Sequence, residues 1–533
     1  MATSPATVTR IGYNNLFPLS TTDPKGQVYQ TAYNALGWVT SETDPAGGVT
    51  SHAYSVDGDL RQTTTRRGQT VTVTYDALHR PLTQTGSHAR SFSYANNGFV
   101  VTGTSAASTQ TSFLNLRGQA DSVQTVLQGQ TFVQRFGYTA AGLLDTVSVT
   151  GPGGMTFQGR KYLYDEAQGL LTGIRLGGAL TQFVTDGNAN PTGITFPAGD
   201  TQQILRGVIQ APIRLTTSAP YVETVERWLG LDKAGRVTAH LNYPDADLGR
   251  FFQFDPLGRL IEGKDMQRPP SGGQTGCPED PNAILCADGS VPSEPTAEYS
   301  VVGTPAVYSF DAVGNRLDLG GSYTPGNRIT QFNGCSYTTD LDGNVTSRSG
   351  GGCGAGASFF WSAEGELDSL HTGTTGVKYL YDAGGRLVVK RVNGVVQPVF
   401  LWQGDNLLAE LDGTATVKRA EYSYYPGLDN LHAVVINNER LYAHADGLGN
   451  VIALTDETQG VRRVYAYDDW GNDAGTGGTS RRPGRFFERG VGNRQSRSRV
   501  FVLRPAAIRL PDTERSGDVV GRRCSWSRPK RTI

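Results

Sequence analysis

The chain has 533 residues and nearly balanced charge, with 48 Lys and Arg residues against 49 Asp and Glu residues. Glycine is abundant at 68 residues and charged residues make up only 18%, a composition typical of many short strands joined by glycine turns. No apolar run reaches the roughly 18 residues of a transmembrane helix, and the N-terminus lacks the basic and apolar regions of a Sec signal peptide. These features exclude a helical membrane span and disfavour a helix-rich fold.

A short repeat runs through most of the chain: an aromatic residue, a polar stretch, a glycine and then a β-rich run. The first four copies start 21, 21 and 19 residues apart, which fits one two-stranded hairpin per copy. The copies start at Tyr33, Tyr54, Tyr75, Tyr94, Tyr138, Tyr164, Leu231, Phe254, Phe310, Asp340, Trp361, Tyr381, Ala445 and Tyr467. The pattern predicts an all-β protein built from tandem hairpins.

The copy FDPLGRL, which starts at Phe254, shows how each turn is encoded. The Asp255 carboxylate can accept a hydrogen bond from the backbone two residues on, and Gly258 can adopt a positive φ without steric cost. This combination predicts a three- to five-residue hairpin loop with a G1-type bulge. We also expect the aromatic residue at each start to stack on its neighbour and to form a ladder across the sheet.

Four segments follow from the distribution of these patterns. Residues 1–265 are predicted to be the first hairpin array, and residues 266–299 a Pro- and Gly-rich loop insert. Residues 300–478 carry further repeats. Residues 479–533 abandon the periodicity for an Arg-rich tail, predicted to be disordered; from residue 481 on it holds 15 Lys and Arg residues against 4 Asp and Glu residues. Such charge attracts phosphate, but no nucleic-acid-binding motif accompanies it, so no specific nucleic-acid partner is expected.

The five cysteines suggest two local pairs and one odd residue. Cys277 and Cys286 lie in the insert, whereas Cys335 and Cys353 flank one hairpin turn and Cys524 lies in the tail. Either pair could form a disulfide, or the thiols could be free. Two disulfides would fit an exported protein better than a cytosolic one.

Motifs for catalysis and cofactor binding are absent from the sequence. It contains no G-x-S-x-G, H-E-x-x-H or P-loop pattern, and its seven histidines are scattered singly. We therefore predict no catalytic, cofactor-binding or metal-ligating residues, no cofactor and no enzymatic activity. A β surface rich in aromatic residues could instead bind carbohydrate, with Trp228, Trp361, Trp402 and Trp470 as the residues to test, although packed roles near the turns are the favoured interpretation.

The repeated FDPLGRL and YDAGGRL segments, together with residues 441–472, resemble the Rhs (rearrangement hotspot) or YD-repeat proteins of bacteria. These are similar to the YD shell of teneurins and of Tc toxins. The resemblance implies a spiralling sheet that forms part of a hollow shell, with residues 300–478 leading into the start of the Rhs-associated core. Its implied partners are an enclosed or fused toxin polypeptide and other shell segments, and its implied location is secreted or at the cell surface.

The sequence departs from this family near its end. No DPxG-type self-cleavage motif follows GRFFERG at residues 484–490, so the chain is expected to be truncated within the core, and a shifted reading frame could explain the tail. The function predicted is therefore a non-enzymatic shell segment that encloses or displays a toxin or mediates surface contact. The alternatives are a carbohydrate- or cell-surface-binding module and a non-functional frameshifted remnant.

Overall fold

The computed structural model describes residues 8–471, except residues 166, 189, 207–211, 220–221, 233, 235, 244–247, 268–299, 427–429, 446–448 and 466. In this part of the chain there are two antiparallel sheets of 25 and 15 strands and no α-helix. The predicted all-β fold of tandem hairpins is confirmed. Residues 268–299 of the predicted loop insert and the whole of the predicted Arg-rich tail lie outside the described residues.

The first sheet contains β1 (Arg10–Tyr13), β2 (Pro18–Thr22), β3 (Val28–Tyr33), β4 (Val39–Thr43), β5 (Val49–Tyr54), β6 (Leu60–Thr64), β7 (Thr70–Tyr75), β8 (Pro81–Thr85), β9 (Arg90–Ala95), β10 (Val100–Ser105), β11 (Ser108–Leu114), β12 (Ala120–Leu127), β13 (Gln130–Tyr138), β14 (Leu144–Thr150), β15 (Arg160–Tyr164), β16 (Leu171–Leu176), β17 (Ala179–Thr185), β18 (Pro191–Thr195), β19 (Thr201–Arg206), β20 (Pro212–Ala219), β21 (Val222–Leu231), β22 (Val237–Tyr243), β23 (Leu248–Phe254), β24 (Leu260–Gln267) and β25 (Ser300–Val307).

The second sheet contains β26 (Ser322–Thr324), β27 (Arg328–Phe332), β28 (Cys335–Thr339), β29 (Val345–Ser349), β30 (Ala357–Trp361), β31 (Leu367–Thr372), β32 (Thr375–Tyr381), β33 (Leu387–Val392), β34 (Val395–Gln403), β35 (Asn406–Leu411), β36 (Lys418–Tyr424), β37 (Leu431–Ile436), β38 (Glu439–Ala445), β39 (Val451–Thr455) and β40 (Val461–Val464). Four short 3-10 segments complete the described elements: η1 (Asn96–Gly98), η2 (Pro152–Gly154), η3 (Asp318–Gly320) and η4 (Gly351–Cys353).

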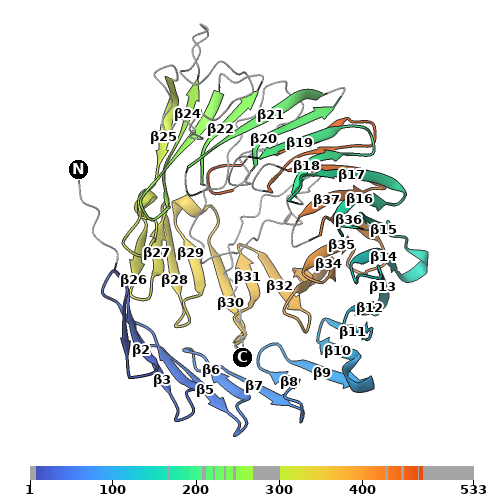
Figure 1. Cartoon of the computed structure of the whole chain (residues 1–533). Coiled ribbons are helices and arrows are strands. Elements are labelled where there is room, and N and C mark those ends of the chain that lie inside the picture. The colour runs from blue at the N-terminus through green and yellow to red at the C-terminus, as the bar shows by residue number, and fades with distance from the viewer. Residues whose placement is uncertain are drawn as a thin grey trace.

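The two sheets wind around a common axis as successive turns of one spiral (Figure 1). Within each sheet, strands that are consecutive in sequence pair with each other, as β3 does with β4 and β32 with β33, so the chain advances around the axis one strand at a time. The first sheet makes the first turn, and the second sheet then runs alongside it. Contacts between the turns join residues that are far apart in sequence, such as Arg250 and Asp469, 219 positions apart, and Gln27 and Asn327, 300 positions apart.

The predicted turn geometry is confirmed at FDPLGRL. The Asp255 carboxylate accepts hydrogen bonds from the backbone N–H groups of Leu257 and Arg259, both at 2.9 Å, and Gly258 has a φ of 77°. The strand register shifts between Gln253 and Phe254, as a bulge requires. The fifth turn residue adds a contact that the sequence analysis did not foresee, because the Arg259 guanidinium binds the other Asp255 oxygen at 2.5 Å.

The predicted aromatic ladder is only partly correct. Phe17 and Tyr33 stack with ring centroids 4.9 Å apart, but the recurring contact is a hydrogen bond instead. The hydroxyl of the aromatic residue donates to a carbonyl oxygen at the start of a strand in the preceding repeat, as Tyr75 does to Leu60 at 2.9 Å. The same contact recurs at Tyr33, Tyr94, Tyr138, Tyr164, Tyr381 and Tyr467. Neighbouring repeats are therefore joined by directional bonds as well as by ring packing.

The apolar core lies where the two turns pack side by side. Its largest cluster combines Phe132 and Ile174 of the first sheet with Val389 and Leu401 of the second, all fully buried. By contrast, strands β3, β5 and β9 alternate between exposed and half-buried side chains. The early strands thus bury little apolar area, so their attachment to the second turn depends largely on polar contacts.

Candidate functional site: the polar seam between the two turns

Polar contacts follow the whole line along which the second turn of the spiral meets the first, and we call this line the seam. The first turn contributes the hairpin connections at residues 23–27, 44–48, 65–69 and 86–89, together with polar side chains of later strands. The second turn contributes mainly its repeat turns. The paired residues are Lys25 and Asp311, Arg67 and Asp342, His88 and Glu366, Gln110 and Arg386, Gln134 and Trp402, Gln202 and Ala445, and Arg250 and Asp469.

Arg67 shows how one side chain can attach a repeat turn to the other sheet. Its guanidinium donates to the Asp342 carboxylate at 2.5 Å and to the backbone carbonyls of Trp361 at 3.1 Å and Ser362 at 2.8 Å. The planar fork of arginine suits such multiple acceptors. Its side chain is 18% exposed, so these contacts are partly shielded from water and are stronger than those of a surface ion pair.

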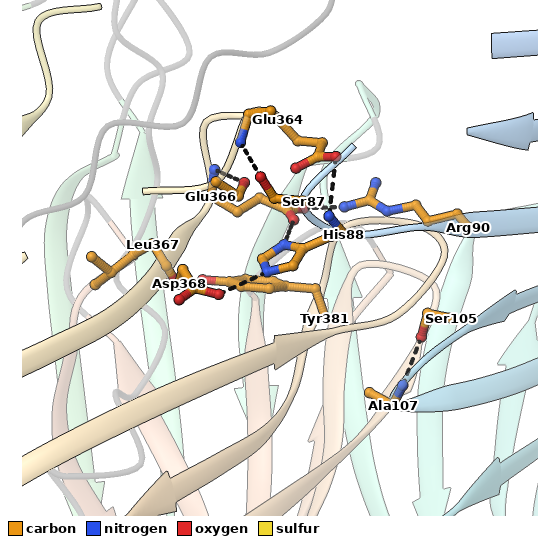
Figure 2. A network of polar contacts seen from close by, with 12 residues as sticks. Ser87, His88, Arg90, Ser105, Ala107, Glu364, Glu366, Leu367, Asp368 and Tyr381 are labelled. Carbon is orange, nitrogen blue, oxygen red and sulfur yellow. Dashed lines mark hydrogen bonds and ion pairs between the residues drawn. The ribbon is translucent and has the colours of Figure 1, made fainter. Parts of the chain in front are cut away.

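His88 lies at the centre of a second polar cluster on the seam (Figure 2). Its ring atom Nδ1 is 2.7 Å from Oε2 of Glu366, and Nε2 is 3.1 Å from Oδ1 of Asp368. The Arg90 guanidinium also binds Glu366. Oε1 of Glu364 accepts a hydrogen bond from the backbone N–H of His88 at 3.2 Å. Residues 86–90, which enter β9, are thereby joined to the turn that leads into β31.

The carboxylates of this cluster favour the protonated form of His88. The hydrogen bond to Glu366 raises the pKa of His88 above its ordinary value of 6.5, outweighing the opposing effect of burial. Burial opposes ionisation of Glu366, yet the contacts with His88 and Arg90 lower its pKa. Burial likewise opposes ionisation of Asp368, and the contacts with Lys378 and His88 lower its pKa. These shifts therefore all favour an imidazolium between two ionised carboxylates.

A deeply buried ion pair of the seam lies near the end of the described chain. Asp469, whose side chain is fully buried, accepts hydrogen bonds from Arg250 at 2.8 and 2.6 Å and from the Tyr308 hydroxyl at 2.7 Å. Arg250 also donates to Asp265 at 3.0 Å. Burial and the neighbouring Asp469 both raise the pKa of Tyr308, so its hydroxyl remains a donor. The last described repeat turn is thus attached to β23 and to Tyr308, which follows β25.

Two further histidines are buried at the seam. His432 lies 2.8 Å from the Thr181 hydroxyl of the first turn, and burial lowers its pKa to about 3, so it is neutral near pH 7. His444 lies 2.8 Å from the Thr455 hydroxyl and 3.2 Å from Asp200. The sequence analysis treated all histidines as isolated because their partners are remote in sequence.

The structure describes only some of the cysteines and tryptophans that the sequence analysis singled out. Cys335 and Cys353 form a disulfide with Cα atoms 5.3 Å apart, whereas Cys277, Cys286 and Cys524 lie outside the described residues, as does the side chain of Trp228. The indole N–H groups of Trp361 and Trp402 donate to backbone carbonyls, both at 2.8 Å. The Trp470 ring packs against Tyr308 and Arg316. These three tryptophans therefore hold repeats together.

The seam holds one group of side chains with the composition of a metal site. Within the described part of the chain, the possible ligand atoms of His88, Glu364 and Glu366 lie within 4.8 Å of one another. However, the Arg90 guanidinium binds Glu366 directly, and both ring nitrogens of His88 already face carboxylates. A divalent cation would have to displace the shared proton and lie close to the guanidinium charge. The arrangement therefore fits a proton-linked ion-pair cluster rather than a metal centre.

The fold and the seam define a structural class: a spiral β-wall built from tandem YD hairpins. Comparisons with known proteins agree with this class. The sequence matches the Teneurin YD-shell family over residues 298–476 and the RHS repeat over residues 15–49. In these two regions the chain is thus similar to the Rhs, or YD-repeat, proteins.

Relatives in bacteria include two WapA proteins. The chain is 28% identical over 188 residues to the tRNA3(Ser)-specific nuclease WapA of Bacillus spizizenii, and 28% identical over 190 residues to the tRNA nuclease WapA of Bacillus subtilis. Each match covers 33% of this chain and 8% of the relative. The chain thus corresponds to a small part of those proteins.

The fold is similar to that of solved Tc toxin components. The crystal structure of TcdB2-TccC3 without its hypervariable C-terminal region matches with a TM-score of 0.61 and 14% identity, over 88% of this chain and 28% of that one. The Tc holotoxin pore of Photorhabdus luminescens matches with a TM-score of 0.52 and 13% identity, over 88% of this chain and 27% of that one. In the described residues no helix is long and apolar enough to span a bilayer.

Proposed function

We propose that this chain forms two stacked turns of a shell wall that encloses a toxin polypeptide fused to it or associated with it. The observation that carries the proposal is the continuous seam, which makes one wall from strands more than 200 residues apart. A wall of this kind needs directional contacts between turns and no catalytic group of its own. The polypeptide it encloses would supply any enzymatic activity.

The opposite rim of the first turn supports assembly with further shell segments. Alternate hairpin connections lie at opposite ends of the strands, so the turns at residues 34–38, 55–59, 76–80 and 115–119 point away from the seam. These turns form what we call the free rim, and they present apolar side chains that are 67 to 92% exposed. The residues are Leu36, Val56, Leu78 and Leu116. Because the second turn docks through the same type of repeat turn, the partner we propose for this rim is another ribbon of YD repeats.

The proposal includes export. The Cys335–Cys353 disulfide fits an oxidising compartment, in keeping with a secreted or cell-surface protein. A carbohydrate-binding role has less support, because Trp361, Trp402 and Trp470 have structural partners. Glycan binding abolished by replacement of any of these residues, with the fold retained, would favour that alternative.

Protease protection of a fused polypeptide tests the enclosing role. An unfolded reporter of about 100 residues would be joined after Ile533 or, as the matched control, before Met1. We expect proteinase K to digest the C-terminal reporter at least tenfold more slowly, and we expect Arg67→Ala, which removes three seam contacts, to reduce this protection. Equal digestion of both reporters would contradict the proposal.

A further inference from the structure

The His88 cluster is a place on the seam where the charge balance depends on a single proton. The charged groups that face His88 are Glu364 and Glu366 from the turn before β31, Asp368 from β31, Arg90 from its own strand β9, and Lys378 from β32, which binds Asp368. Three carboxylates thus face two permanent cations. The cluster carries a net charge of −1 when the ring is neutral and becomes neutral when the ring is protonated.

The hydrogen-bond geometry also requires the proton. A neutral imidazole has one N–H donor and one nitrogen lone pair. Because Nδ1 is 2.7 Å from Glu366 and Nε2 is 3.1 Å from Asp368, a neutral ring would place its lone pair against a carboxylate oxygen. Only the imidazolium can donate to both partners. The Tyr381 ring, centred 5.5 Å from that of His88, covers the imidazole without supplying a competing acceptor.

We propose that protonation of His88 controls how tightly the two turns of the wall are joined, and we call this contact the latch. In its protonated form His88 ties residues 86–90 of the first turn to Glu366 and Asp368 of the second. Without the proton the cluster has a net charge of −1, and a nitrogen lone pair of the ring faces a carboxylate oxygen. The two turns are then held together less strongly at this point. The inference concerns the seam itself, so it holds whether or not the wall encloses a polypeptide.

The direction of the pH dependence follows from the pKa shifts. The pKa of His88 is raised, so the stabilising contribution is complete below its ordinary value of 6.5 and is lost as pH rises through the raised value. The pKa values of Glu366 and Asp368 are lowered, so both stay ionised until the pH falls below their ordinary values of 4.5 and 3.8. The latch is therefore closed in mildly acidic solution and opens on the alkaline side.

Hydrogen exchange of the full chain at pH 6.0 and pH 8.5 tests the latch, with rates corrected for the intrinsic effect of pH and with a chelator in both buffers. We expect the protection factors of residues 86–92 and 362–368 to be at least about threefold higher at pH 6.0 than at pH 8.5, because the raised pKa of His88 makes its contribution to stability larger at the lower pH. His88→Gln should abolish this difference. Asp368→Asn keeps the histidine but removes one carboxylate charge, so the midpoint of the pH dependence of protection should move to lower pH.

His79→Gln is the matched control, because His79 also pairs with a carboxylate, Asp59, at 3.0 Å, but lies at the free rim. It should leave the pH dependence at the seam unchanged. Equal protection at both pH values, or a pH difference that persists in His88→Gln, would overturn the proposal. A difference that appears only when the chelator is omitted would also overturn it, because the cluster would then be holding a divalent cation.

Discussion

Replacement of Asp469 by Ala is expected to detach the last described repeat turn from the first turn of the wall. The side chain of Asp469 is fully buried and accepts three hydrogen bonds, two from Arg250 and one from Tyr308. After the substitution Arg250, which is only 10% exposed, keeps its contact with the Asp265 carboxylate. Breaking a buried ion pair costs about 3 to 5 kcal/mol, and the retained Asp265 contact places the expected cost near the lower limit.

Local hydrogen exchange is the appropriate assay, because long repeat arrays need not unfold in one cooperative step. A loss of about 3 kcal/mol corresponds to a fall of roughly 150-fold in the protection of β23, β24 and residues 465–471. Glu439→Gln is the control, since Glu439 pairs with Arg462 where both side chains are about half exposed, and its effect should stay below about 1 kcal/mol. A fall of less than about fivefold for Asp469→Ala would refute the reasoning.

Three further predictions concern single features of the wall. Cys335→Ser opens an 18-residue loop and should lower local stability by about 3 kcal/mol, measured by exchange in β28; an unchanged rate would show that the disulfide is not formed. Gly343 has a φ of 88° and open space around it, so Gly343→Ala should lower the free energy of unfolding by about 1 to 2 kcal/mol through backbone strain alone. Gly159 also lies in open space but has no positive φ, so Gly159→Ala, the control, should have almost no effect on thermal unfolding. Burial raises the pKa of Glu410, outweighing its hydrogen bond from Tyr422. The contribution of Glu410 to the stability of the wild-type protein therefore weakens as pH rises above 4.5. The melting temperature of Glu410→Gln minus that of the wild type should thus be larger at pH 7 than at pH 4.5. A smaller difference at pH 7 would contradict this.

The sequence was sufficient to predict the hairpin turns because their determinants are local. Asp255 and Gly258 lie within one turn, and each satisfies a need of the backbone that adjacent residues create. The contact between Arg259 and the Asp255 carboxylate could also have been predicted, because Arg or Asn recurs at the fifth position of many turns. The aromatic ladder was partly wrong, because the hydroxyl of Tyr75 reaches a carbonyl of the preceding repeat, a contact that composition alone does not distinguish from ring stacking.

The seam could not be predicted in the same way. His88 and Glu366 are 278 positions apart, and their meeting depends on how many residues one turn of the spiral contains. That number results from the accumulated twist and length of all the intervening hairpins. A slip of one repeat would give His88 different partners, so no local pattern identifies Glu366. The buried His432 and His444 were missed for the same reason.

The stacking of the two turns in a defined register is the central claim, and a designed disulfide across the seam tests it most directly. A Cβ atom at Gly103 would lie 3.0 Å from the Cβ of Ala383, within reach of a disulfide after a small adjustment. In a background with Cys277, Cys286 and Cys524 replaced by Ser, the pair Gly103→Cys and Ala383→Cys is predicted to crosslink readily on mild oxidation, as detected by peptide mass spectrometry. The control pair, Gly103→Cys with Ala363→Cys one repeat away, should not. Absence of the first crosslink, or equal yields for both pairs, would contradict the stacked-turn structure.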